Sequence, residues 1–247
     1  YVDGEFRMVL LRRKKNTPPP YRQCVGYYSV LREEEPVFYE KCCSRMQQMG
    51  EVLGFENCVV HADLIRMRNE AGELTQEPFV IETSARPSGH NLSNLFTPLA
   101  TGVTLVEDFL KLAIPELAER KEAAEEGNGW TSKQENGSAS GAEAAGIRAK
   151  LFCPARTRKL LIRYFDLGPG RVILVPDPEV LKKRFPLLDY VCSICPGDEL
   201  LEVTDGASVM GRGYYILEGE SDAQLDETDE RLRQEFSVET NTEGKME

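Results

Sequence analysis

Residues 77–89, EPFVIETSARPSG, decide how this sequence is interpreted. An apolar run ends at the acidic residue Glu82, and Arg86 and Gly89 follow within seven residues. The run has the composition of a buried strand, and the proline, serine and glycine after it indicate a turn. A strand that delivers a carboxylate and a guanidinium to its own end needs a functional explanation.

A second strand, predicted over residues 57–67, carries Asp63. The polar turn at residues 69–73 separates it from the strand at residues 78–83, so the pattern predicts an antiparallel hairpin. If Asp63 pairs near Glu82, both carboxylates project from one face of the sheet. Two adjacent carboxylates are unfavourable unless a cation lies between them, and Mg²⁺ or Mn²⁺ with phosphate oxygens suits such a pair.

The residues after the second strand extend this interpretation. The planar guanidinium of Arg86 can hold a transferring phosphoryl group or a carboxylate through two hydrogen bonds. Gly89 lets the backbone approach a ligand closely. The pattern predicts magnesium nucleotide chemistry near Arg86. The simpler alternative is a surface ion pair between Glu82 and Arg86, which contributes little.

Two segments, HADLIRM at residues 61–67 and FVIETSARPSG at residues 79–89, resemble the C-terminal catalytic half of the ATP-grasp carboxylate-amine ligases. The bacterial L-amino acid (dipeptide) ligases look most similar. The opening YVDGEF, residues 1–6, resembles a strand of that family that starts with a Gly-Glu step. The resemblance covers residues 1–115 and, more loosely, 147–220. It implies an α+β fold, with an ATP-grasp C-terminal subdomain followed by a small β-rich domain.

The resemblance also implies roles for individual residues. Asp63 and Glu82 match the metal ligands, and Arg86 matches the arginine that contacts the transferred phosphate. The expected substrate-binding residues are Ser84, Gly89, His90 and Asn91. In such enzymes ATP, as co-substrate with Mg²⁺ or Mn²⁺, phosphorylates a small carboxylate, and an amine attacks the acylphosphate. Amino acids or small peptides are the expected substrates.

This sequence departs from the family pattern in three ways. Asp63 is shorter than the usual glutamate, and Ser84 stands at the common asparagine position, as a small residue does in the dipeptide ligases. The lysines and the adenine-binding strand of the family's first half have no counterpart here. These departures motivate an alternative function, a non-catalytic nucleotide-binding or scaffold module. A carboxylase is a third hypothesis, ranked last because no biotin-carrier lysine motif is visible.

Composition limits the partners and the compartment. The net charge of −11 argues against a general nucleic-acid or anionic-membrane surface. No apolar run approaches the ~20 residues of a membrane helix. The seven cysteines, an odd number in apolar contexts, indicate reduced thiols and a cytoplasmic protein. Cys192 and Cys195 have the CxxC spacing, but no second pair completes a zinc site. A homodimer is compatible with this picture.

The expected organisation has four parts: residues 1–118, a flexible linker or insertion at 119–146, a β-rich domain at 147–220 and an acidic tail at 221–247. Within these parts, the pattern predicts a strand at 5–12 and a helix that starts at Pro36 and ends at Gly54. A buried helix is expected at 99–117 and an amphipathic one at 221–236.

Several other residues have more than one interpretation. His61 precedes Asp63 by two, which predicts the same face, although a packed histidine is the simpler role. Whether His90 contacts the substrate is left open. The basic run at residues 12–15 is better explained by a solvated hairpin tip than by phosphate binding. The sequence from Gly211 to Gly213 is better explained by a β-turn than by a phosphate loop.

Overall fold

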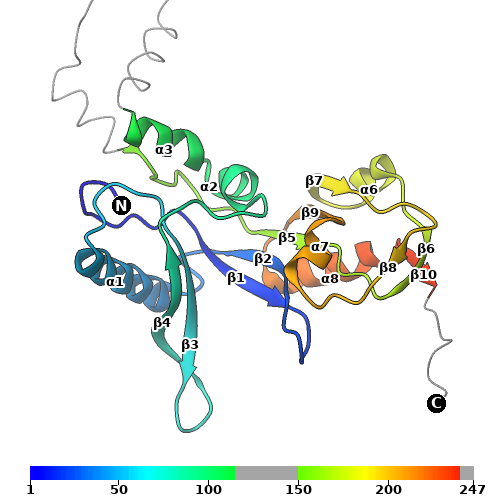
Figure 1. Ribbon diagram of the computed structural model, residues 1–247, viewed down its shortest axis with the longest axis horizontal. Coiled ribbons are helices and arrows are strands. Elements are labelled where there is room, and N and C mark those ends of the chain that lie inside the picture. The colour runs from blue at the N-terminus through cyan, green and yellow to red at the C-terminus, as the bar shows by residue number, and fades with distance from the viewer. Residues whose placement is uncertain (115–149, 240–247) are drawn as a thin grey trace, which may run out of the picture. The chain divides into compact units, whose positions relative to one another are not determined.

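The computed structural model describes residues 1–114 and 150–239 of the chain. The chain forms two compact units, and each combines segments that are far apart in sequence (Figure 1). Unit 1 contains residues 1–9 and 32–156, and unit 2 contains residues 10–31 and 157–247. The expected boundary at residue 118 and the whole of the expected linker lie outside the described residues, so the four-part division stays a prediction.

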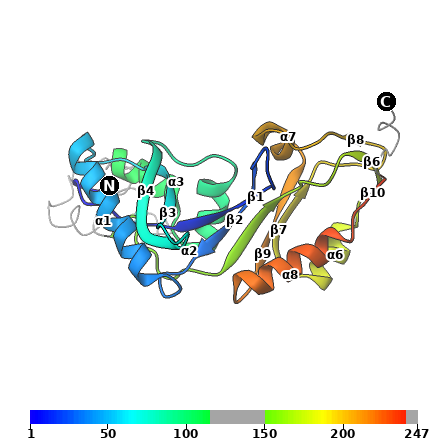
Figure 2. The same ribbon diagram turned by 90° about the horizontal axis from the view of Figure 1, so that it is seen from below.

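Unit 1 contains a long helix and a two-stranded hairpin. Helix α1 (Pro36–Leu53) has a proline in its first turn and ends at Gly54, whose φ of 70° is left-handed and whose N–H donates to the Gly50 carbonyl. This confirms the predicted helix and its glycine stop. Strands β3 (His61–Arg68) and β4 (Leu74–Ser84) pair antiparallel, as the hairpin pattern predicts. Helix α1 packs against β4 (Figure 2).

The hairpin has one covered face and one open face. The α1-facing side carries Arg66, whose guanidinium lies 3.8 Å above the ring of Phe38 and pairs with Glu35 at the start of α1. On β4, Phe79 is 59% exposed and Ile81 is 61% exposed. The expectation that the apolar run of β4 is buried is therefore wrong for these two residues. A two-stranded sheet with a helix on one side leaves its other side chains in solvent.

Three short helices follow the hairpin: η1 (Leu92–Phe96), a π-helix, then α2 (Thr97–Thr101) and α3 (Leu105–Ala113). The single buried helix expected at residues 99–117 is wrong. Gly102 has a φ of 77° and ends α2, so the chain turns before α3 begins. The buried core here is apolar and combines distant segments: Val2, Val59, Val103, Leu105, Leu112, Leu151 and Phe152.

Unit 2 is built on a five-stranded antiparallel sheet with the order β1-β2-β5-β9-β7. These strands are β1 (Leu11–Asn16), β2 (Cys24–Val30), β5 (Leu160–Tyr164), β9 (Gly213–Glu218) and β7 (Leu187–Cys192). A smaller sheet pairs β6 (Gly170–Leu174) with β10 (Ser237–Glu239) and β8 (Glu199–Leu200). Three helices complete the described part of the unit: α6 (Pro178–Arg184), α7 (Gly206–Met210) and α8 (Asp222–Arg233).

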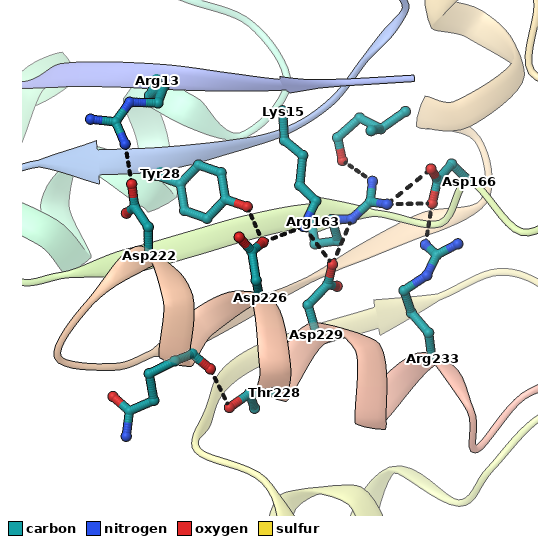
Figure 3. Close-up of polar contacts among 12 residues, drawn as sticks. Arg13, Lys15, Tyr28, Arg163, Asp166, Asp222, Asp226, Thr228, Asp229 and Arg233 are labelled. Atoms are coloured by element: carbon teal, nitrogen blue, oxygen red, sulfur yellow. Dashed lines mark hydrogen bonds and ion pairs between the residues drawn. The ribbon is translucent and has the colours of Figure 1, made fainter. Parts of the chain in front are cut away.

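Helix α8 confirms the amphipathic helix predicted near residues 221–236, and its acidic residues contact strand β1. Arg13 pairs with Asp222, and the Lys15 ammonium contacts the carboxylates of both Asp226 and Asp229 (Figure 3). The basic run at 12–15 therefore lies within a strand. The strand expected at residues 5–12 is displaced toward the C-terminus, and the expected hairpin tip is wrong.

The end of this ion-pair series is buried in unit 2. The side chain of Asp229 accepts hydrogen bonds from Tyr215 and from Arg163, whose Nε lies 3.2 Å from Oδ2. Arg163 also donates to the Val25 carbonyl at 2.8 Å and pairs with Asp166 (Figure 3). Every charge at this position therefore has a partner, as burial requires. Within the described residues, no helix is long and apolar enough to cross a membrane.

Candidate active site

The register of the hairpin places Asp63 directly opposite Glu82. This meets the condition under which the sequence pattern places both carboxylates on one face of the sheet. Residues opposed in this way have their side chains on the same face, with Cβ atoms about 4.5–5.5 Å apart. The register shifts just beyond this pair, because Leu64 pairs with Val80 and Ile81 is an extra residue in β4. Such irregularities change the direction of neighbouring side chains and are enriched next to functional sites.

The two carboxylates lie on the open face of the hairpin. His61, Asp63 and Ile65 alternate with the residues of β3 that face α1, so they share the open face. The Nε2 atom of His61 lies 3.6 Å from Oδ1 of Asp63, which confirms that these two side chains point the same way. A ligand can therefore approach Asp63 and Glu82 from outside the hairpin.

The donor set fits a magnesium ion that is completed by phosphate. Among the described residues, no group of three or more His, Cys, Asp and Glu side chains is arranged to hold a metal ion. A zinc site needs three or four protein ligands, whereas Mg²⁺ commonly uses one or two carboxylates together with substrate phosphates. Asp63 and Glu82 supply the two carboxylates that a Mg²⁺ site commonly uses, but not the three or four protein ligands that a zinc site needs.

Arg86 lies in the turn that follows β4. Its backbone N–H donates to the Ser84 carbonyl at 2.8 Å, and its guanidinium Nη1 donates to the Pro87 carbonyl at 3.0 Å. The side chain is exposed. Within the described part of the chain, Glu82 and Arg86 form no ion pair, so the simpler explanation of this spacing finds no support.

The loop after Arg86 has an unusual backbone. His90 and Asn91 are adjacent and both adopt left-handed conformations, with φ values of 60° and 59°. The N–H of Phe96 then donates to the Asn91 carbonyl at 2.8 Å, which closes the first turn of η1. Adjacent left-handed residues and π-helices both concentrate at functional sites. At Gly89, an added Cβ would meet no atom within 4 Å, so there is open space beside its backbone.

His90 is held neutral at physiological pH. Its partial burial lowers the pKa of the imidazole, and the positive charge of Arg86 lowers that pKa further. A neutral imidazole can accept a hydrogen bond or a proton.

The structure keeps the predicted site residues in one part of unit 1. Ser84 pairs with His61 at the end of the hairpin that carries Asp63 and Glu82. The remaining residues, Arg86, Gly89, His90 and Asn91, follow directly in the loop. Their roles as metal, phosphate and substrate ligands stay predictions. Sequence reasoning missed the apolar open face and the π-helix. Three consecutive apolar residues at 79–81 were a usable signal, because a regular strand cannot bury all three against one helix.

Comparison with known proteins gives a fold. No protein-family model matches the sequence, and no curated protein sequence matches it. The L-amino acid ligase from Bacillus licheniformis superposes with a TM-score of 0.63 at 16% identity, over 98% of this chain and 50% of that one. The phosphoribosylglycinamide synthetase from Anaerococcus prevotii gives a TM-score of 0.60 at 14% identity, over 93% of this chain and 49% of that one.

The chain has the ATP-grasp fold. It spans about half the length of each of these two ligases. The fold class expected from residues 61–67 and 79–89, a mixed α and β structure with antiparallel sheets, is confirmed. Because the identities are below 20%, the similarity establishes the ATP-grasp fold, and the chemistry must be argued from the site.

Proposed function

We propose that this chain carries the metal- and phosphate-binding part of an ATP- and Mg²⁺-dependent ligase that joins a carboxylate to an amine. The observation that carries the proposal is the pairing of Asp63 with Glu82 on the open face of a hairpin within an ATP-grasp fold. The resemblance of residues 79–89 to dipeptide ligases supports amino acids or small peptides as substrates.

The open face suits a magnesium nucleotide. Asp63 and Glu82 hold the cation, which when bound neutralises the charge of the ATP phosphate oxygens. Beside them, Ile65 and Phe79 pair on the same face and are about half exposed. These apolar side chains can cover the uncharged part of a nucleotide, while the carboxylates hold the metal near its phosphates.

The loop residues would position the reacting groups. Arg86 can hold the γ-phosphoryl group through two hydrogen bonds while a substrate carboxylate oxygen attacks the phosphorus and ADP leaves. An amine nitrogen then attacks the acyl carbon, and inorganic phosphate leaves. The amine must lose a proton in this step, and neutral His90 can accept it. Ser84, Gly89 and Asn91 would orient the substrates.

The test measures Mg²⁺-dependent phosphate release from ATP by the full gene product with pairs of amino acids. Glu82→Ala and Asp63→Asn should each lower turnover by at least about a hundredfold, because each removes a group that stabilises transferring phosphate. Their thermal unfolding should stay close to that of the unmodified protein, since both residues lie on the open face. Glu77→Ala is the matched control, an exposed acid on the same strand that pairs with Lys41, and it should keep turnover.

The outcomes separate two functions. Retained turnover in Glu82→Ala would show that the site assignment is wrong. Absence of phosphate release with every pair, together with absence of ATP binding in calorimetry with and without Mg²⁺, would favour the alternative of a non-catalytic scaffold module.

The same proposal assigns the enzyme to the cytoplasm, where thiols stay reduced, and no disulfide joins cysteines in the described residues. It is compatible with a homodimer.

A further inference from the structure

The loop between strands β1 and β2 of unit 2 carries four consecutive ring-bearing residues, the sequence PPPY at 18–21. The paired part of the two strands ends at Asn16 and Cys24. Beyond that pair, the N–H of Thr17 donates to the Gln23 carbonyl at 2.8 Å and closes the loop. Figure 1 shows the loop, in blue, extending beyond the ends of β1 and β2. No role proposed for the hairpin of unit 1 uses this segment.

The rings of this loop lie in solvent. The three prolines at residues 18–20 are all exposed, and Tyr21 is 43% exposed. The N–H of Gln23 donates to the Thr17 hydroxyl at 2.9 Å, so the base of the loop is held by polar groups. Substitutions at exposed positions of this kind usually change stability little. Packing within the protein therefore does not explain why four rings stand together here.

Consecutive prolines suit one mode of protein recognition. Proline fixes φ at about −65° and has no N–H, so a proline run loses little conformational entropy when it binds in an extended form. The modules that recognise such runs have grooves lined with aromatic side chains, against which the pyrrolidine rings pack. Tyrosine is among the residues that contribute most to protein–protein affinity. A proline run that ends in an exposed tyrosine therefore has the composition of a docking segment.

The spacing of the four residues selects among the proline-binding modules. One class binds the pattern Pro-x-x-Pro, but the residue three positions after Pro18 is Tyr21, and residues 10–31 contain no prolines with that spacing. The WW class binds the pattern Pro-Pro-x-Tyr, in which two adjacent prolines enter the aromatic groove and the tyrosine enters a neighbouring pocket. Residues 18–21 match this second pattern, with Pro20 at the variable position.

The hairpin determines how the segment is presented. Residues 19–21 form a turn in the unbound protein. A module that binds residues 18–21 in an extended form therefore selects a minor conformation of the loop, which weakens its apparent affinity relative to a free peptide. The paired strands need not move, because their ladder ends at Asn16 and Cys24.

We propose that residues 18–21 are a docking site for a partner protein that carries a WW-type groove. Pro18 and Pro19 pack against the aromatic side chains of the groove, and the ring of Tyr21 fills the adjacent pocket. The position of Pro20 is not selected by the groove. The docking site lies in unit 2 and shares no residue with the hairpin site of unit 1, so the proposal does not depend on the ligase function.

The experiment is a calorimetric titration of the full gene product with a purified WW module that binds Pro-Pro-x-Tyr peptides. A synthetic peptide of residues 15–24 is titrated in parallel. The module should bind both, and its Kd for the protein should be within about a hundredfold of its Kd for the peptide, because the loop must leave its turn. A module of the Pro-x-x-Pro class should bind neither.

Three variants of the full gene product test the spacing. Tyr21→Ala should weaken binding of the WW module at least about thirtyfold, and Pro19→Ala at least about tenfold, because each removes an anchor. Pro20→Ala is the matched control, a neighbouring exposed proline in the same loop, and it should change the Kd less than about threefold. The midpoint of thermal unfolding should stay the same in all three variants, since all three residues are exposed.

Each other result would overturn the proposal. Binding to the peptide without binding to the full gene product would show that the folded loop does not present the segment. Absence of binding to both would show that the sequence is not a WW ligand. Equal losses in Pro19→Ala and Pro20→Ala, or equally tight binding of the Pro-x-x-Pro module, would show that the Pro-Pro-x-Tyr spacing is not what is recognised.

Discussion

Asp229 of α8 is 1% exposed yet carries its charge at neutral pH. Burial alone would raise the pKa of this carboxyl group. The positive charge of Arg163, the hydrogen bond from Tyr215 and the ammonium of Lys15 outweigh burial, and together they hold the pKa below its ordinary value. Arg163, Tyr215 and Lys15 lie on three different strands, and all three contact the carboxylate of Asp229 on α8.

Asp229→Ala should destabilise the protein by about 3–5 kcal/mol, because it leaves the buried guanidinium of Arg163 short of negative charge. Urea denaturation measures the change in the free energy of unfolding. Asp226→Ala is the control on the same helix. Its carboxylate also contacts Lys15, but 44% of its side chain is exposed, so its loss should cost about 1 kcal/mol or less. Equal costs for the two variants would contradict this account of the ion-pair series.

The lowered pKa of Asp229 predicts how stability depends on pH. A carboxyl group whose pKa is lower in the folded state contributes stability above the unfolded pKa, about 3.9 for aspartate. That contribution should disappear as the pH falls below about 4 and through the folded pKa. Urea midpoints measured between pH 7 and pH 3 should decrease, and Asp229→Asn should flatten the decrease. A slope unchanged in Asp229→Asn would assign the acid sensitivity to other carboxyl groups.

At the residue scale, the sequence predicted contacts between residues that are close in the chain, but not contacts between distant residues. The hairpin that carries Asp63 and Glu82 followed from the sequence, because a single polar turn joins its two strands, whereas the direct pairing of these two residues came from the structure. The partners of Asp229 did not follow from the sequence, since Lys15 and Arg163 lie 214 and 66 residues away. Local sequence patterns contain no signal for contacts at such separations.

Individual elements depend on glycines in two different ways. Strand β9 begins at Gly213, which has a φ of 103°, and a Cβ there would lie 2.1 Å from the Val191 carbonyl oxygen of the neighbouring strand. Gly54, after α1, has a φ of 70°, but a Cβ there would meet no atom within 4 Å. A side chain would strain the backbone at both positions, but it would clash with neighbouring atoms at Gly213 and not at Gly54.

Gly54→Ala should therefore cost about 1–2 kcal/mol, the strain of a left-handed alanine. Gly213→Ala should cost about 1–3 kcal/mol more, because the β7–β9 pair must also separate to make room. Thermal or urea unfolding of both variants, measured side by side, checks the difference. If the two substitutions had the same effect, backbone strain alone would explain the glycine in β9.

Two predicted elements had wrong boundaries, for two different reasons. The strand expected at residues 5–12 lies at Leu11–Asn16, because the basic side chains Arg13 and Lys15 find acidic partners on α8. Sequence polarity alone favoured an exposed connection there. The helix expected at residues 99–117 divides at Gly102, a position where the apolar pattern outweighed the glycine signal in the prediction.

At the scale of the whole molecule, residues 10–31 belong to unit 2, although residues 32–156 of unit 1 separate them from the rest of that unit. Unit 2 therefore depends on a segment that is distant in the sequence. Strand β5 lies between β2 and β9, and all five of its residues are buried. Strand β2 also supplies the Val25 carbonyl that accepts a hydrogen bond from buried Arg163. Removing residues 10–31 would remove β1 and β2 and turn β5, the central strand, into an unpaired edge strand.

A fragment of residues 157–247 should therefore show no cooperative thermal unfolding, because its central strand lacks a neighbour. Fusing residues 10–31 to its N-terminus through a flexible glycine-serine linker should restore a cooperative transition. Circular dichroism measured against temperature distinguishes the two fragments. A cooperative transition in the shorter fragment would show that β1 and β2 are not needed for unit 2 to fold.

At this scale, the sequence by itself determined the hairpin, the helix at Pro36–Leu53 and a resemblance that predicted the ATP-grasp fold. These features rest on residue spacing, turn residues and side-chain periodicity, which act between near neighbours in the chain. Only the tertiary structure decided that residues 10–31 belong to unit 2 and that one hairpin face stays open. Those outcomes depend on which distant surfaces meet, and packing between distant segments leaves no local pattern in the sequence.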